Sequence, residues 1–194
     1  MKVRAIRIGS MEQGDRNDSR LAALATWGKR LGRLGITPGG SGNLSIRTEN
    51  GFTITRTGVE LGHIGPEDWV EVTLIGRDDD DSLRVEYYGE HEPSRDAFVH
   101  GTVYGQQTFA GAIFHLHDRD ALDASVRLGI PSTERFFPAG TSESVAEIER
   151  FLEHQPEARY FALVEHGIVA WGDDVDVTGE LVETWHARAE LGRD

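Results

Sequence analysis

The sequence predicts an α/β protein with a single domain, in which a central, mostly antiparallel β-sheet is flanked by helices. Two observations lead to this expectation. Most of the strand signals follow one another with only short turns between them, which favours pairing between neighbours, and amphipathic helical segments stand before and after them. The 194 residues contain no internal repeat and no linker, and this length suits one domain with a sizeable core.

The chain is expected to begin with an arm and a helix. Residues 1–17 show no strong hydrophobic period, so we expect a flexible N-terminal arm ahead of a domain that covers residues 18–194. A helix is expected from Asp18 onward, and Gly35 is a typical stop. The predicted apolar face of this helix consists of Leu21, Leu24, Leu31 and Leu34.

A glycine-rich turn, PGGSGNLSIR, follows this helix and leads into four strand signals. The strands are expected at 43–47, 52–56, 69–75 and 82–88. The aspartate run at 78–81 is expected to be a solvated hairpin turn, because a calcium loop needs alternating ligands and a closing glutamate.

The second half of the chain is expected to alternate helices with apolar strands. The helices are expected at 94–107, at 120–128, from about 142 onward, and at 175–191. Ser94 suits the N-cap of the first, and Ser144 and Glu147 have capping-box spacing in the third. The strands between them are AIF, at the start of the stretch AIFHLHDRD, and one last strand, YFALVEHGIVAWG.

The charge of the chain excludes two classes of partner. The net charge is −13, from 33 acidic and 20 basic residues. Such a field repels nucleic acid and anionic membrane surfaces, so neither is expected as a partner.

The hydrophobic pattern bears on where the protein resides. No apolar run approaches the roughly 20 residues of a membrane helix, and the N-terminus lacks the apolar core of a secretory signal. We therefore expect a cytoplasmic protein that must build a local positive site to bind an anion.

Two scarce residue types restrict the chemistry. The chain has no cysteine, so it has no thiolate nucleophile and no cysteine-based zinc site. Its only lysines are Lys2, in the expected arm, and Lys29, on the polar side of the first helix. A Schiff-base lysine has to be buried next to its substrate, which suits neither position. Carbonyl chemistry here would need a metal instead.

Three histidines have the pattern of a metal site. Successive side chains of a strand alternate between its faces, so His115 and His117 share one face. His166 ends another apolar strand, and Gly167 after it permits a close backbone approach. Most histidines in folded proteins bind no metal, and an ordinary core pair is the alternative. Three neutral imidazoles with an open position describe a catalytic zinc site better than a structural one.

The turn GGSGN has two interpretations. It does not match the dinucleotide-binding pattern G-x-G-x-x-G and lacks the Walker lysine, so nucleotide binding is disfavoured. It is either a plain tight turn or an anion nest, in which backbone N–H groups, Ser41 and Asn43 donate hydrogen bonds to a phosphate.

Five motifs together give the sequence a family resemblance. GGSGNLSIR, ITRTG, EPSRDAFVH, HLHD and EHGIVAWG occur in the order and spacing of the class II aldolase/adducin family, from about Ser19 to Leu191. In pattern, the chain resembles the L-fuculose-1-phosphate aldolases. The resemblance implies the single-domain fold of that family and a homotetramer with active sites between subunits. It also implies zinc, or alternatively manganese or cobalt, on His115, His117 and His166.

The resemblance further implies a site for a small anionic substrate, a sugar phosphate or a related oxo or hydroxy acid. The family's catalytic glutamate falls at Asp96. Its phosphate site maps onto Ser41, Gly42, Asn43, Thr57, Gly58 and Ser94. Arg95 is expected on its own chemistry to be a further contact, because its guanidinium suits a carboxylate as well as a phosphate. The implied activity is that of a lyase that cleaves an aldol through a metal-stabilised enediolate, with the carboxylate moving the carbon-bound proton.

Departures from the family pattern keep other reactions open. Asp96 stands where the family has glutamate, and Arg95 where the aldolases commonly have serine. The segment between His117 and Gly140 contains no tyrosine, whereas the aldolases place their proton donor there. Decarboxylation, dehydration and epimerisation therefore remain alternatives. A non-catalytic adducin-like module is disfavoured, because such domains lose metal ligands.

The remaining histidines are expected to have no direct part in the reaction. His100 lies one helical turn after Asp96, so it is expected to be structural or to support the site. The other four are expected to be ordinary surface residues: His63, His91, His154 and His186.

Overall fold

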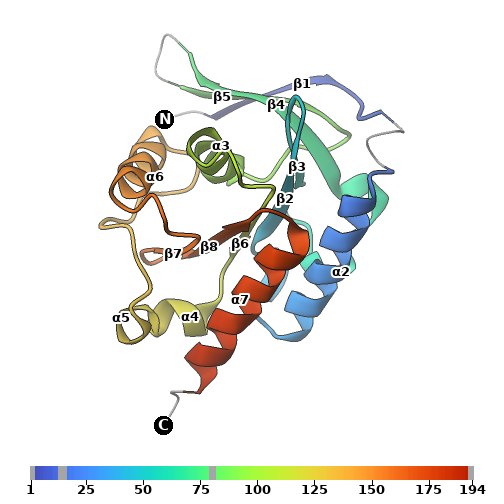
Figure 1. Ribbon diagram of the computed structural model, residues 1–194. Helices are drawn as coiled ribbons and strands as arrows, with labels where there is room; N and C mark the ends of the chain where they lie inside the picture. The colour runs from blue at the N-terminus through green and yellow to red at the C-terminus, as the bar shows by residue number, and fades with distance from the viewer. Residues whose placement is uncertain (1–2, 13–16, 79–81, 192–194) are drawn as a thin grey trace.

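One sheet organises the molecule. The computed structural model describes residues 3–12, 17–78 and 82–191. Its sheet has eight strands in the order β1-β5-β4-β3-β2-β6-β8-β7, and every neighbouring pair is antiparallel except β1 and β5 (Figure 1). The strands are β1 (Val3–Gly9), β2 (Asn43–Thr48), β3 (Gly51–Thr55), β4 (Trp69–Arg77), β5 (Leu83–Tyr88), β6 (Ala112–Leu116), β7 (Tyr160–Leu163) and β8 (Gly167–Gly172). The mostly antiparallel sheet expected from the sequence is confirmed.

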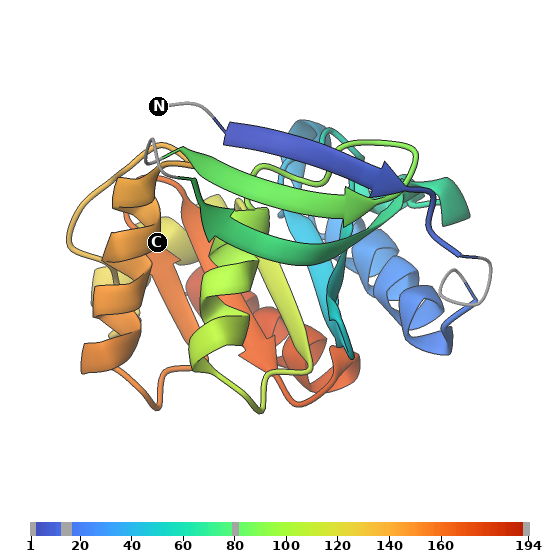
Figure 2. The same ribbon diagram turned by 90° about the horizontal axis from the view of Figure 1, so that it is seen from above.

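Helices cover the two faces of this sheet (Figures 1 and 2). They are α2 (Ser19–Arg33), α3 (Ala97–Gln106), α4 (Arg119–Asp123), α5 (Ser125–Leu128), α6 (Ser142–His154) and α7 (Val175–Glu190). Three short 3₁₀ turns add Pro38–Gly40, Leu61–His63 and Pro66–Asp68. No helix among the described residues is long and apolar enough to cross a membrane.

The core has two parts, one on each side of the sheet. Helices α2, α4 and α7 pack on one face, where Phe114 of β6 and Leu44 of β2 are buried. Helices α3 and α6 pack on the other, where Ile113 of β6 is buried. This alternation along β6 directs His115 towards the α3 face, which is where the polar residues of the site gather.

The N-terminal segment is not the arm that the sequence predicts. Residues Val3–Gly9 form β1, an edge strand that pairs in parallel with β5. Arg4 binds Asp78, and Arg7 donates to the carbonyl of Gly89. An edge strand gains its backbone hydrogen bonds from its neighbour and buries little side-chain surface, so it needs no hydrophobic period that a sequence pattern would reveal.

The last predicted strand is also wrong as a single element. A hairpin turn divides it into β7 and β8, and His166 lies in this turn rather than within a strand. The backbone N–H of His166 closes the turn on the carbonyl of Leu163 at 3.0 Å. Glu165 adopts φ 59°, a left-handed conformation that turns the chain.

Three local expectations at helix ends also change. Helix α3 has its N-cap at Asp96, and Ser94 lies just before it, accepting a hydrogen bond from the N–H of Asp96. The capping box of α6 joins Thr141 to Ser144 and does not use Glu147. Leu34 of the predicted apolar face is 43% exposed, because α2 has already ended.

The predicted aspartate turn falls in the connection between β4 and β5. The N–H of Asp78 binds the carbonyl of Ser82 there, and residues 79–81 lie outside the described part of the chain.

Candidate active site

Three imidazoles meet at the end of β6. His115 is the fourth residue of this strand, His117 directly follows its last residue, and His166 comes from the β7–β8 hairpin. The ring centroids are 5.2 Å apart for His115 and His117, 4.8 Å for His115 and His166, and 5.0 Å for His117 and His166. Because β6 and β8 are neighbours, the hairpin turn lies beside the end of β6, which is why segments 50 residues apart converge.

A carboxylate completes this cluster. Asp96 reaches it from the N-cap of α3, and its side chain makes no capping bond to its own helix. One ligand atom from Asp96 and from each of the three histidines all lie within 4.8 Å of one another. The Oδ2 atom of Asp96 is 3.7 Å from Nε2 of His115. We call these four residues the metal cluster.

The metal cluster leaves buried polar atoms without partners. Oδ1 of Asp96, Nε2 of His115 and Nε2 of His117 are buried and make no hydrogen bond. Each such atom costs about 1–3 kcal/mol if it stays unsatisfied. Nδ1 of His115 donates to the carbonyl of Ile168 at 2.9 Å, which leaves the lone pair on Nε2 directed into the cluster. The three imidazoles, with the carboxylate of Asp96 beside them, therefore fit a divalent cation.

The protonation states agree with this fit. Burial lowers the pKa of His115 to about 4 and also lowers the pKa of His117, so both imidazoles are neutral near pH 7. Burial opposes the ionisation of Asp96, but His115, His166 and the amide of Asn43 outweigh it and hold the pKa of that carboxyl below its usual value. Neutral imidazoles and a charged carboxylate are the forms that bind a metal.

A buried chain of hydrogen bonds fixes Asp96. Asn43 donates from Nδ2 to Oδ2 of Asp96 and to Oγ of Ser94, both at 2.9 Å. Its Oδ1 accepts from Nε2 of His100 at 2.6 Å, which leaves Nδ1 of His100 to accept from the hydroxyl of Ser45 at 2.6 Å. The Ser45 hydroxyl in turn accepts from Tyr104 at 2.9 Å. Every member has a partner, so the network fixes one orientation of the carboxylate.

Comparison with known proteins identifies the family of the chain. The family model "Class II Aldolase and Adducin N-terminal domain" matches residues 22–191, most of the chain. The chain belongs to the class II aldolase/adducin family.

Members of the family with several activities resemble the chain. It is 31% identical to a methylthioribulose-1-phosphate dehydratase of Acidiphilium cryptum, over 88% of each sequence. It is 27% identical to a 3-oxo-tetronate 4-phosphate decarboxylase of Haemophilus influenzae, over 81% of this chain and 80% of that protein. The crystal structure of L-fuculose-1-phosphate aldolase from Thermus thermophilus matches with a TM-score of 0.68 and 26% identity, covering 89% of this chain and 93% of that one. All three activities are lyase reactions.

The residues expected at the family's phosphate site are brought to one end of the sheet, but they are not equivalent. Asn43 is only 2% exposed, and its amide is used by Asp96, Ser94 and His100, so it supports the carboxylate instead of offering a free donor. Thr57, Gly58 and Arg95 are exposed. Sequence reasoning missed this use of Asn43, because it depends on pairing between distant segments.

The turn at Ser41 and Gly42 contains a side-chain hydroxyl that is free to donate a hydrogen bond. Oγ of Ser41 is buried and has no hydrogen-bond partner. Gly42 adopts φ 89°, and a Cβ there would lie 2.9 Å from the carbonyl oxygen of His115. Side chains rarely adopt this conformation, so the glycine lets the turn pack directly against β6, the strand that carries His115. The carbonyl of Gly58 also borders this turn, at 3.4 Å from a Cβ placed on Gly40.

Two of the other histidines are supporting residues. His100 is fully buried in the network behind Asp96, as its position one helical turn away indicated. His186 was expected at the surface, and this is wrong. It is 4% exposed, and its Nδ1 binds Oδ2 of Asp118 at 2.9 Å, while Asp118 caps α4. The remaining three, His63, His91 and His154, are exposed.

Proposed function

We propose that this chain is a divalent-metal-dependent lyase that acts on a small phosphorylated sugar, with zinc held by His115, His117 and His166. The observation that carries the proposal is the pair of buried, unsatisfied Nε2 atoms of His115 and His117 in the metal cluster. The lyases among its relatives support the same reaction class. A divalent cation there supplies Lewis-acid stabilisation of the charge that develops on neighbouring carbonyl and hydroxyl oxygens of the substrate.

Asp96 is proposed as the group that moves the proton. Its carboxylate is ionised, and its Oδ1 atom is free, whereas Asn43 holds Oδ2. A fixed carboxylate with one free oxygen is suited to take a proton from the carbon next to a carbonyl group. The network of Asn43, His100, Ser45 and Tyr104 keeps this oxygen in place during the reaction, without reorganisation.

The anionic end of the substrate is proposed to lie at the turn 41–43, at Thr57 and Gly58, and at Ser94 and Arg95. The buried, unpartnered hydroxyl of Ser41 supports this placement. Arg95 is exposed and precedes α3, so its guanidinium can add positive charge beside the first N–H groups of that helix. Together these groups would give an acidic protein the local positive site that an anion needs.

Loss of water is the bond-breaking step that we propose first. The relative from Acidiphilium cryptum is a dehydratase, at 31% identity over most of both chains. The segment between His117 and Gly140, where the aldolases carry a tyrosine, has Phe136 and Phe137 here. Aldol cleavage, which the sequence resemblance implies, is the second candidate, and the match to the Thermus aldolase favours it.

Metal analysis tests the shared part of both candidates. Purified protein should contain about one divalent ion per chain, and His117→Ala should lose most of it, because removal of one of three imidazoles leaves an incomplete site. His154→Ala is the matched control, since His154 is exposed and binds only the carbonyl of Arg150. Equal metal content in His117→Ala and wild type would overturn the assignment. Product analysis with ketose 1-phosphates then separates water loss from aldehyde release.

A further inference from the structure

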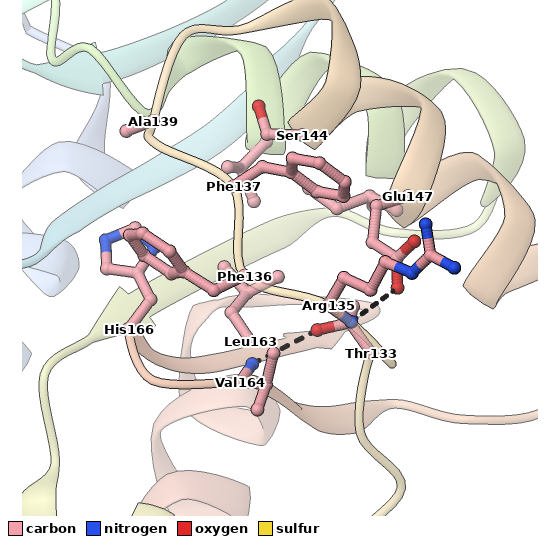
Figure 3. Close-up of a pocket in the computed structure, with 12 residues that line it drawn as sticks. Thr133, Arg135, Phe136, Phe137, Ala139, Ser144, Glu147, Leu163, Val164 and His166 are labelled. Carbon is pink, nitrogen blue, oxygen red and sulfur yellow. Dashed lines mark hydrogen bonds between the residues drawn. The ribbon is translucent and has the colours of Figure 1, made fainter.

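A polar groove lies at the C-terminal end of α2, and no residue of the metal cluster lines it. Its walls are α2, the segment 37–40 that leads into Ser41, and the 3₁₀ turn Leu61–His63. Its free volume is about 450 Å³. The cavity beside His166 in Figure 3 is a different space, about 20 Å³ in volume and mostly apolar. The groove is large enough to hold a small charged molecule.

The rim of the groove carries two cations without partners. Lys29 and Arg33 lie four residues apart on α2, so their side chains leave the same face of the helix. Both are exposed, and neither makes a hydrogen bond or ion pair with another residue in the part of the chain that the structure describes. The carboxylate among the lining residues, Glu60, binds Nδ1 of His63 at 3.1 Å. A chain with a net charge of −13 thus leaves two cations unpaired at one place.

The end of a helix does not account for this lack of partners. Basic side chains in a last turn interact favourably with the helix dipole, which explains why they occur there. Arg30 lies in the same turn, yet its guanidinium pairs with Glu183 and lies 4.8 Å from the ring centre of Trp27. Pairing with a carboxylate is therefore possible for a cation of this turn, and the side of α2 that faces the groove is left with free positive charge.

The floor of the groove suits an anion. Gly32, between the two cations, has no side chain, and a Cβ there would lie 3.8 Å from Oγ1 of Thr37. This hydroxyl makes no capping hydrogen bond, so it is available to a ligand. An ammonium, a guanidinium and a hydroxyl that line one space are donors that proteins use for phosphate. The apolar side chain in the lining, Leu61, is only 1% exposed, so an apolar ligand would find little surface to contact.

The groove borders the turn that is proposed to hold the substrate's phosphate. Gly40 lines the groove directly before Ser41. A Cβ on Gly40 would lie 3.4 Å from the carbonyl oxygens of Gly58 and Val59, so the two walls of the groove meet beside that turn. The free cations of α2 are thus close to the place where an acidic protein has to attract an anion.

We propose that the groove is a second anion site, in which Lys29, Arg33 and Thr37 bind a phosphate group. The ligand is inorganic phosphate or the phosphate group of a small phosphorylated sugar, because both present the same anionic oxygens to these donors. The site needs neither the metal nor Asp96, so it goes beyond the proposed reaction. It also gives a function to Lys29, which is unsuited to Schiff-base chemistry.

The scarcity of lysine makes the groove directly observable. Reductive methylation with ¹³C-formaldehyde labels Lys2, Lys29 and the N-terminal amine, and each keeps its charge and one N–H donor. Lys29→Arg identifies the Lys29 signal in the NMR spectrum. Inorganic phosphate should shift this signal until it saturates, whereas sodium chloride at equal ionic strength should not. A Lys29 signal that does not respond, or that responds equally to both salts, would overturn the site.

Two variants of the same helical turn locate the anion. Arg33→Gln removes a proposed donor and should weaken phosphate binding about tenfold, as expected for a hydrogen bond between charged groups. Arg30→Gln removes the same charge and should keep the affinity within about twofold, because Arg30 is already paired with Glu183. The Lys29 signal reports both affinities. Equal phosphate affinity in Arg33→Gln and wild type would contradict the assignment.

The same signal, followed in metal-free protein that turns nothing over, separates the two sources of the phosphate group. Tighter binding of ribulose 1-phosphate than of inorganic phosphate would assign the groove to the sugar phosphate, and equal or weaker binding would assign it to phosphate itself. Arg95→Gln alters the proposed active-site contact and should not change the response. A response that is lost in Arg95→Gln but kept in Arg33→Gln would overturn the groove as the site. Protein that binds no metal contradicts the proposed function alone.

Discussion

At Asp96, one carboxylate combines a hydrogen-bonded oxygen with a free one. Asp96→Asn keeps the shape of the side chain but cannot accept a proton, so turnover should fall by a factor on the order of 10²–10⁴. The three histidines are unchanged, and metal should remain bound. Steady-state kinetics and metal analysis of the same preparation check both statements. Near wild-type turnover would show that another group moves the proton.

The buried histidines predict how stability depends on pH. Burial lowers the pKa of His100 from 6.5 to about 3 and that of His115 to about 4. Between these values and pH 6.5, the unfolded chain binds more protons than the folded one. The metal-free protein should therefore be most stable above pH 6.5 and lose about 1.4 kcal/mol per pH unit for each histidine as the pH falls towards 4. Urea denaturation at a series of pH values measures this slope.

Two variants isolate the contribution of one residue to that slope. His100→Gln removes a buried titrating group and should make the dependence on pH shallower. His63→Gln is the control, because the side chain of His63 is 82% exposed. A stability that stays constant between pH 6.5 and 5 would contradict the linkage.

Residue patterns predicted the members of the metal cluster but not the network behind it. Alternation along a strand placed His115 and His117 on one face, and the family motif pointed to Asp96. Asn43 was expected to bind phosphate, yet its amide is buried against Asp96 and His100. These two partners lie at the start of α3 and within it, more than 50 residues away along the chain. The hydrophobic periodicity of a short segment carries no information about hydrogen bonds to such distant residues.

At the level of elements, Gly167 determines how closely β8 approaches β6. A Cβ on this residue would lie 2.5 Å from the carbonyl oxygen of Leu116, 3.2 Å from the ring of His115 and 3.3 Å from that of His117. Gly167→Ala must therefore push the hairpin away from the end of β6. We expect metal affinity to fall about tenfold or more, as for other changes around metal ligands. Competition with a chelator measures it.

Gly105→Ala is the control for this substitution. Gly105 lies near the end of α3, and a Cβ there would meet nothing within 4 Å. Metal affinity should be unchanged, with a gain of up to about 1 kcal/mol in stability from the better helix former. Wild-type affinity in Gly167→Ala would mean that the hairpin can move without disturbing the ligands.

Elements with a strong pattern were predictable, and those that depend on a distant partner were not. The helices α2, α6 and α7 and the strands from β2 to β6 follow from apolar periodicity and turn residues. The strand β1 depends on β5 for its hydrogen bonds, so its own sequence carries little signal. Glu165 and His166 interrupt the apolar run at the β7–β8 turn, but the turn was missed because they are not one of the glycine- or asparagine-containing pairs typical of hairpin turns.

At the level of the whole molecule, the resemblance to the family leads us to expect a homotetramer. Most soluble oligomers have closed symmetry, and the resemblance implies active sites between subunits. Light scattering at micromolar concentration should give about four times the 21.5 kDa of the chain. A strict monomer that still turns over substrate would contradict both the assembly and a shared active site.

The parallel pairing of β1 with β5 has a consequence for biosynthesis. Val3 pairs with Leu83 and Arg7 with Tyr87, so β1 finds its partner strand only after some 80 further residues have left the ribosome. Contacts of such long sequence separation form late, because the intervening chain must be ordered first. During translation, β1 is therefore an unpaired strand, and its two arginines, Arg4 and Arg7, discourage association with the same segment of another nascent chain.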